Sequence, residues 1–248
     1  MKKKKPKRQP ARQHEAVVQP QQQALYHSLR ERVEEHVHKA LQLERSPMAL
    51  IRLALAAHHT CQDSHQSLDP AALQRLACQS GCDYCCHPPV SAAVPEVANI
   101  AAYIQSQLPQ AEQQRLTQRV EQVYARVHPL SGEERAALSL ACPFLEAGRC
   151  SIYPVRPLAC RGHNSTSRQA CQKVFEQPSR QQLIPSYVPL MASAQGLKEG
   201  LVAGLQRAGL KSPLVDLVRA SHKLLGELDD NLEDWLSGGD TFADCQPF

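Results

Sequence analysis

The chain has 248 residues, of which 42% are apolar and only 4% aromatic. That length allows one good hydrophobic core, and the dominance of Ala, Leu and Gln favours helix over sheet. The formal net charge is +4, but six cations lie within the first eight residues, so the rest of the chain carries a net charge of −2. This excludes a folded domain with a broad basic patch for nucleic acid, and leaves only weak contact by the N-terminal tail.

The N-terminus lacks the features of a secretion signal. The basic start is followed by polar residues rather than an apolar segment, and no apolar run approaches the roughly 20 residues that a membrane-spanning helix needs. We therefore expect a cytoplasmic protein without a membrane segment. In a reducing compartment, ten cysteines favour metal binding or redox chemistry over disulfides.

The first third of the chain is predicted to be helical after a polar start. Residues 1–20 have the composition of a disordered basic tail. Apolar residues recur at every fourth position over about 21–44, which predicts an amphipathic helix. Ser46-Pro47 has the form of a helix start, with Ser as cap and Pro in the first turn. That helix is expected to end near residue 59, and a shorter one to cover 69–78.

The middle of the chain alternates between a loop and helices. Residues 79–90 contain Gly and a Pro-Pro pair and predict a loop. Helices are expected over about 94–108 and 111–128. Ser131, followed three residues later by Glu134, forms a capping box that predicts one more helix start.

The last part begins with a small predicted β-structure. Between Cys142 and Tyr153, short apolar segments on either side of an Ala-Gly pair predict a tiny hairpin. Helices are then expected over about 169–175, 189–208 and 213–225. Residues 229–248 are rich in Asp and Glu and are expected to form an acidic tail.

Eight of the ten cysteines lie between residues 78 and 171. Thiolates are soft ligands, and zinc and iron–sulfur clusters take up to four of them. We expect these thiols to bind zinc, iron or an iron–sulfur cluster, and all eight are candidate ligands: Cys78, Cys82, Cys85, Cys86, Cys142, Cys150, Cys160 and Cys171.

The adjacent pair Cys85 and Cys86 poses a separate question, because neighbouring side chains diverge in most backbone conformations. Both are therefore not expected in one mononuclear site. One of them binds a second metal, packs inside, or acts as a redox partner. His87 and His163 lie beside cysteines and are further candidates.

The spacing of Cys78, Cys82 and Cys85 also matches the cluster motif of radical S-adenosylmethionine enzymes. Those enzymes need strands that alternate with helices, and this sequence does not predict such alternation. The pattern therefore argues against that class.

Two separate motifs carry a resemblance to a known family. Cys78-Gln-Ser-Gly-Cys82-Asp-Tyr-Cys85-Cys86, with Pro95-Glu96 after it, resembles the YkgJ-like cysteine-cluster proteins, which are described as zinc- or iron-chelating. The second half is similar too: Cys142-Pro-Phe-Leu, then Gly148-Arg-Cys150-Ser-Ile-Tyr153, then Arg156-Pro-Leu-Ala-Cys160-Arg161. The first gap has three residues, where two is usual in the family.

The resemblance implies metal binding through cysteines and implies no particular reaction. A few relatives resemble flagellin lysine N-methylases, which adds a methyl-transfer enzyme as an alternative. Arg156 and Arg161 flank Cys160, and we expect their guanidinium groups to donate hydrogen bonds to a thiolate or a cluster sulfur. The other interpretation is that they pair with carboxylates or cap helix carbonyls.

The predicted fold class is mostly α: a helical bundle around a cysteine-rich metal-binding loop, with a small β-hairpin. Five parts are expected: the disordered basic tail (1–20), N-terminal helices (21–76), the cysteine-cluster domain (77–176), C-terminal helices (177–228) and the acidic tail (229–248).

The primary functional hypothesis is a metal-binding protein. The alternatives are an iron–sulfur redox or protein-lysine methyl-transfer enzyme, and a helical interaction protein that the metal stabilises. The sequence does not decide whether the protein is an enzyme, which metal it binds, or which protein it meets.

Overall fold

The computed structural model describes residues 20–177 and 183–248, and most of them are helical. The predicted mostly-α class is therefore confirmed, while the tail expected over 1–20 lies almost wholly outside the described residues. Within the described residues the helices are α1 (Pro20–Leu43), α2 (Pro47–Gln66), α3 (Pro70–Gln74), α4 (Val94–Gln107), α5 (Gln110–Val127), α6 (Gly132–Ala137), α7 (Leu158–Gly162), α8 (Arg168–Glu176), α9 (Val188–Arg207), α10 (Leu217–Gly226) and α11 (Leu228–Leu236).

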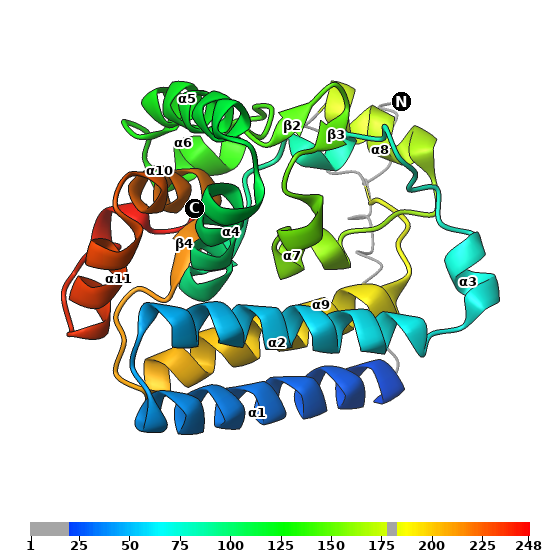
Figure 1. Ribbon diagram of the computed structural model, residues 1–248. Helices are drawn as coiled ribbons and strands as arrows, with labels where there is room; N and C mark the ends of the chain where they lie inside the picture. Colours follow the sequence, from blue (N-terminus) through cyan, green and yellow to red (C-terminus); the bar gives the residue numbers. More distant parts are fainter. Residues whose placement is uncertain (1–19, 178–182) are drawn as a thin grey trace, which may run out of the picture.

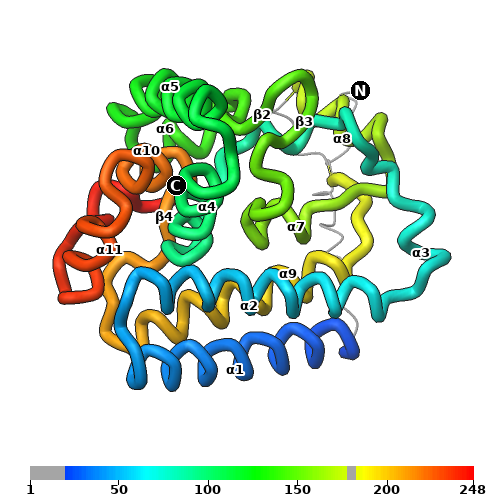
Figure 2. Tube along the Cα trace, viewed as in Figure 1, coloured from blue at the N-terminus to red at the C-terminus, as the bar shows by residue number. Residues whose placement is uncertain are grey.

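Long helices α1, α2 and α9 form one layer, at the bottom of Figure 1. The backbones of α1 and α9 run unusually close together, as the tube in Figure 2 shows. Gly196, Gly200 and Gly204 recur every fourth residue and so share one face of α9. A Cβ atom added to Gly200 would lie 2.6 Å from the carbonyl oxygen of Arg30, so glycine is required for this approach. This seam was not predicted from the sequence.

Helix α4 occupies the centre of the molecule, between that layer and a second group made of α5, α10 and α11 (Figure 1). Nine of its residues, from Val94 to Ile104, are buried. A helix that is apolar on nearly all sides is stable only when other elements surround it. The start of α4 at Val94, a few residues after the cysteine loop, thereby fixes one end of that loop against the core.

Two short antiparallel sheets complete the fold. Strands β2 (Leu145–Glu146) and β3 (Arg149–Cys150) form the predicted hairpin. Strand β1 (Ser91–Ala93) pairs with β4 (Leu214–Asp216), in the register Ala92 to Val215. This second pairing joins segments more than a hundred residues apart. The sequence pattern does not predict it and instead indicates helix over residues 214–216.

The C-terminal segment corrects one expectation. Residues 229–248 do not form an acidic tail but belong to the folded core. Trp235 and Phe242 are completely buried with ring centroids 5.5 Å apart, and Cys245 in the 3₁₀-helix η3 (Ala243–Cys245) is 1% exposed. The acidic side chains lie on the outer face, and the apolar ones between them pack inward, which is the pattern of an amphipathic helix.

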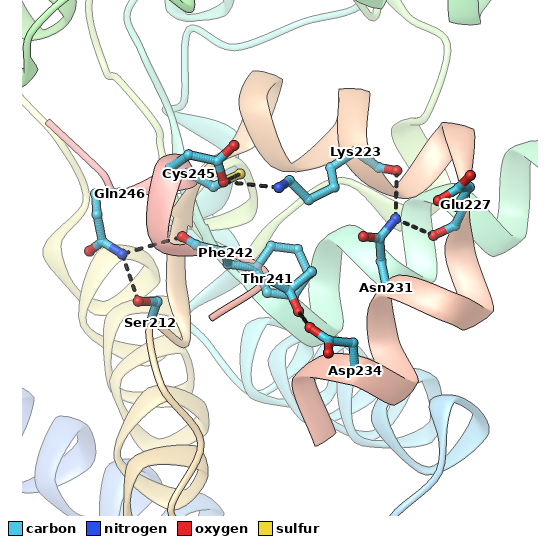
Figure 3. Close-up of polar contacts among 10 residues, drawn as sticks. Ser212, Lys223, Glu227, Asn231, Asp234, Thr241, Phe242, Cys245 and Gln246 are labelled. Atoms are coloured by element: carbon cyan, nitrogen blue, oxygen red, sulfur yellow. Dashed lines mark hydrogen bonds and ion pairs between the residues drawn. The ribbon is translucent and has the colours of Figure 1, made fainter. Parts of the chain in front are cut away.

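Polar contacts hold the same segment in place (Figure 3). Asn231 donates hydrogen bonds to the carbonyl oxygens of Lys223 at 3.3 Å and Glu227 at 2.6 Å, and so links α11 to the end of α10. Gln246 donates to Ser212 Oγ at 2.7 Å, in the turn that precedes β4. The chain end is therefore tied to the same region as β4.

Candidate metal centre

The eight clustered cysteines sit on short elements at one end of the molecule. Cys85 and Cys86 lie on the 3₁₀-helix η1 (Tyr84–Cys86), just after Cys78 and Cys82 in the loop. The others come from later segments: Cys142 in the loop before β2, Cys150 on β3, Cys160 on α7 and Cys171 on α8. All eight are free thiols and none is fully buried.

Backbone hydrogen bonds join the first cysteine segment directly to the second. The amide of Cys142 donates to the carbonyl oxygen of Cys86 at 2.8 Å, and the amide of Leu140 donates to that of His87 at 3.0 Å. These bonds place η1 beside the start of the hairpin, although the two segments are more than fifty residues apart. Main-chain hydrogen bonds therefore bring the two cysteine motifs together in space.

The hairpin turn makes a second contact with the loop. Ala147 and Gly148 both have positive φ, at 48° and 74°, as a two-residue hairpin turn requires. A Cβ atom on Gly148 would lie 3.5 Å from the carbonyl oxygen of Gly81, which itself has a φ of 85°. The turn therefore packs on the loop backbone between Cys78 and Cys82, and Cys150 follows it on β3.

Helix α8 closes the other side of η1. The ring of Phe175 lies 4.6 Å from the ring of His87 and 5.6 Å from that of Tyr84. Nearby, the amide of Ala77 donates to the carbonyl oxygen of Ser165 at 2.8 Å. These contacts bring Cys171, on the same helix as Phe175, to the cysteine loop (Figure 1).

Several of the thiols raise one another's pKa, and for description we divide them into two groups. Burial raises the pKa of Cys78, and the neighbouring thiols of Cys85, Cys82 and Cys171 raise it further. We call Cys78, Cys82 and Cys171 the first thiol group.

The second thiol group consists of Cys142, Cys150 and Cys160. Burial raises the pKa of Cys142 to about 12, with a further contribution from Cys150. The pKa of Cys160 is also raised, by burial first and then by Cys142, Cys150 and Cys85. Cys85 couples to Cys78 of the first group and to Cys150 and Cys160 of the second.

Cys85 and Cys86 follow one another on η1. The hydrogen bond between the two thiols is the largest cause of the raised pKa of Cys85, followed by burial. Cys86 is more buried than Cys85, and its carbonyl oxygen is the acceptor for Cys142.

The two arginines beside Cys160 differ in what they contact. Arg156 stacks over the ring of Tyr153 with its Cζ 3.8 Å from the ring centroid, and its buried Nε has no hydrogen-bond partner among the described residues. Its positive charge lowers the pKa of Cys85, Cys150 and Cys160 against the effect of burial. The charge of Arg156 thus acts on these thiols, as it does on Cys61.

Arg161 instead binds the main chain. Its Nε donates to the carbonyl oxygen of Arg156 at 2.9 Å, and its guanidinium also donates to that of Pro154. Arg161 therefore fixes the turn that carries Arg156, which matches the carbonyl-capping interpretation rather than a bond to sulfur.

Comparison with known protein families gives one match. Residues 77–180 match the family model CxxCxxCC, described as a putative zinc- or iron-chelating domain. The resemblance drawn from the two cysteine motifs is thereby confirmed. The matched segment is less than half of the chain and contains all eight clustered cysteines. Searches of curated proteins and of solved structures found no match.

The family description supports metal binding by this chelating domain, and the donor set is of the right kind. Soft, all-sulfur donors suit zinc and iron. Within residues 20–177 and 183–248, however, no three His, Cys, Asp or Glu side chains stand in a geometry that could hold a metal ion. Thiols must lose their protons to coordinate, and the raised pKa values keep several of these protonated at neutral pH. Sulfur positions are therefore expected to tighten as a metal replaces the protons.

The two candidate histidines near the cysteines differ in their surroundings. His87 Nδ1 lies 3.1 Å from the carbonyl oxygen of Asp83, and its ring packs on Phe175. His163 follows α7 and is exposed. Cys61 and Cys245, in contrast, are 1% exposed, and burial raises the pKa of Cys61 to about 11.

In the part of the chain that the structure describes, no helix is long and apolar enough to cross a membrane.

Proposed function

We propose that the chelating domain binds zinc or iron through thiolates of both cysteine segments. The observation that carries this proposal is the approach of the first cysteine segment to the second, since the main chain joins Cys142 to Cys86 and Cys85 is coupled electrostatically to Cys78, Cys150 and Cys160. Its firmest geometric support is the hydrogen bond of 2.8 Å from the amide of Cys142 to the carbonyl oxygen of Cys86. Inert core thiols would instead be scattered and fully buried, as Cys61 and Cys245 are.

The proposed ligands are drawn from the two thiol groups and the pair between them. Cys85 has neighbours in both groups, and it is therefore the thiolate whose loss affects the whole centre. Cys86, next to Cys85 in the chain and less exposed, is its immediate partner. Four thiolates satisfy one tetrahedral ion, so eight are enough for two ions or for one iron–sulfur cluster with spare thiols.

Arg156 is proposed as the group that balances the negative charge of this centre. A site of four thiolates around a divalent ion keeps a net charge of −2, and a nearby guanidinium stabilises it. The unpartnered Nε of Arg156 and its stacking on Tyr153 leave the guanidinium available for this purpose. Arg161 is proposed to act through Arg156, whose carbonyl it binds.

A bound metal ion would supply a soft, positively charged centre that fixes the loop, the hairpin and α7 relative to one another. Because the ten cysteines are all unpaired, a reducing compartment such as the cytoplasm is the proposed location.

Elemental analysis of untagged protein purified without oxygen tests the proposal. We expect at least one zinc or iron per folded chain. Colourless protein with stoichiometric zinc indicates a simple zinc site, while brown protein with a broad visible band indicates an iron–sulfur cluster. A folded, metal-free protein that takes up neither zinc nor iron would contradict the proposal.

A further inference from the structure

Glu96 is a completely buried carboxylate in the first turn of α4. One of its oxygens, Oε2, accepts a hydrogen bond from the amide of Ala93 at 2.9 Å, and so caps its own helix. Ala93 has no side-chain acceptor, so only the glutamate half of a capping box is present. A buried carboxylate is costly unless its oxygens are hydrogen-bonded, which makes the second oxygen informative.

The second oxygen reaches a different part of the chain. Oε1 of Glu96 accepts a hydrogen bond of 2.6 Å from the amide of Leu158, the first residue of α7. Amides in the first turn of a helix have no partner within that helix, and the preceding residue, Pro157, brings no donor of its own. Glu96 therefore supplies the acceptor for the start of α7.

The opposite end of α7 is also fixed. A Cβ atom on Gly162 would lie 2.6 Å from Cβ of Ala194 on α9, so this end is pressed against the long-helix layer. Helix α7 has only five residues, from Leu158 to Gly162, and cannot keep its place through its own hydrogen bonds. Its position is determined by Glu96 at one end and by α9 at the other.

Helix α7 carries Cys160, two residues after the amide that Glu96 binds. We propose that Glu96 is a positioning residue of the metal centre, which holds Cys160 in reach of Cys142 and Cys150. This inference rests on the proposed function. It adds a residue that is not a proposed ligand but determines whether the second thiol group is complete.

A third element meets the same carboxylate. His58 of α2 is 4% exposed, and its Nε2 lies 3.5 Å from Oε1 of Glu96. The carboxylate thus connects α2, α4 and α7. Glutamine cannot replace it fully, because its amide has one acceptor oxygen where the carboxylate has two. One of the two buried amides, Ala93 or Leu158, would lose its acceptor.

The test compares Glu96→Gln with two matched controls. Glu134→Gln alters the equivalent capping glutamate of α6, whose Oε2 accepts from the amide of Ser131 at 2.8 Å, on a helix without cysteines. Gly204→Ala disturbs the seam between α1 and α9, where an added Cβ would lie 2.5 Å from Cβ of Val37. Gly204→Ala thus destabilises the fold at a place other than the cysteine cluster, and shows what a general loss of stability does to zinc binding.

Two readouts are measured on the folded fraction of each protein. The first is zinc affinity, from competition with a coloured chelator. The second is the visible spectrum of the cobalt(II) form, whose sulfur-to-cobalt charge-transfer intensity reports the number of bound thiolates. Glu96→Gln is expected to weaken zinc binding about tenfold and to reduce that intensity, as supporting residues of metal sites do. Both controls should keep the wild-type values.

The outcomes separate this inference from the proposed function. Wild-type protein that binds none of zinc, iron and cobalt would overturn the proposed function itself. A wild-type protein that binds both, beside a Glu96→Gln variant with unchanged affinity and spectrum, would overturn only the role of Glu96. If Glu96→Gln does not fold, the shorter carboxylate of Glu96→Asp takes its place, with the same two readouts and the same criterion.

Discussion

Replacing Cys85 with alanine is expected to weaken zinc binding more than any other single change in the chain. Cys85 neighbours both thiol groups, so its loss opens the centre from both sides. Loss of a supporting residue costs a metal site roughly 10- to 100-fold in affinity, and loss of a shared ligand should exceed that range. Zinc affinity of the purified variant, measured against a chelator of known affinity, gives the comparison.

Two other cysteine variants make the result specific. Cys171→Ala removes a member of the first thiol group only, and its effect should be smaller than that of Cys85→Ala. Cys245→Ala removes a buried thiol next to Asp244, outside the eight clustered cysteines, and zinc affinity should not change. Equal affinities for Cys85→Ala and Cys245→Ala would show that Cys85 is no ligand.

The largest effect on stability is expected at Asp216. This carboxylate is completely buried; it accepts from Arg135 Nε at 2.8 Å and from the amides of Val218 and Arg219 at 2.8 and 3.0 Å. Asp216→Ala would leave Arg135, itself 4% exposed, as an uncompensated buried charge. Breaking such a pair lowers the free energy of unfolding by about 3–5 kcal/mol.

Urea unfolding followed by the fluorescence of Trp235, the single tryptophan, measures this loss. The control is Asp240→Ala, which removes an exposed ion pair with Lys211, 2.9 Å apart, and should change the midpoint little. Similar midpoints for the two variants would mean that the buried pair contributes no more than a surface one.

The helices were predictable because their signals are local. Ser46 caps α2 by accepting a hydrogen bond from the amide of Ala49 at 3.1 Å, as the Ser-Pro start indicated. Ser131 and Glu134 form the predicted capping box, with both reciprocal bonds present. The hairpin followed from the Ala-Gly turn. Each of these features depends on residues within a few positions of one another.

The features that the sequence did not reveal depend on contacts between distant segments. The pairing of β1 with β4 joins three-residue strands whose sequences carry no periodicity long enough to detect. The spacing of Gly196, Gly200 and Gly204 was a visible signal for close helix packing, but it does not say that α1 is the partner. The acidic residues of α11 concealed Trp235 and Leu232, which face the core.

In the candidate centre, too, local features were predictable from the sequence and tertiary contacts were not. Its cysteines and Arg156 were recognisable from residue type and spacing. The distinct role of Arg161, the bond from Leu158 to Glu96 and the two thiol groups were not, because they depend on how α7 and η1 are placed by the rest of the fold. Sequence identifies candidate donors, and tertiary contacts decide which of them meet.

The central claim is that the two cysteine segments bind metal together. Alkylation of each cysteine, quantified by mass spectrometry during zinc titration of the metal-free protein, tests it most directly. We predict that thiols of the 78–86 segment and of the 142–171 segment become protected in parallel, at the same zinc concentration. Protection of one segment alone, or of neither, would contradict the account.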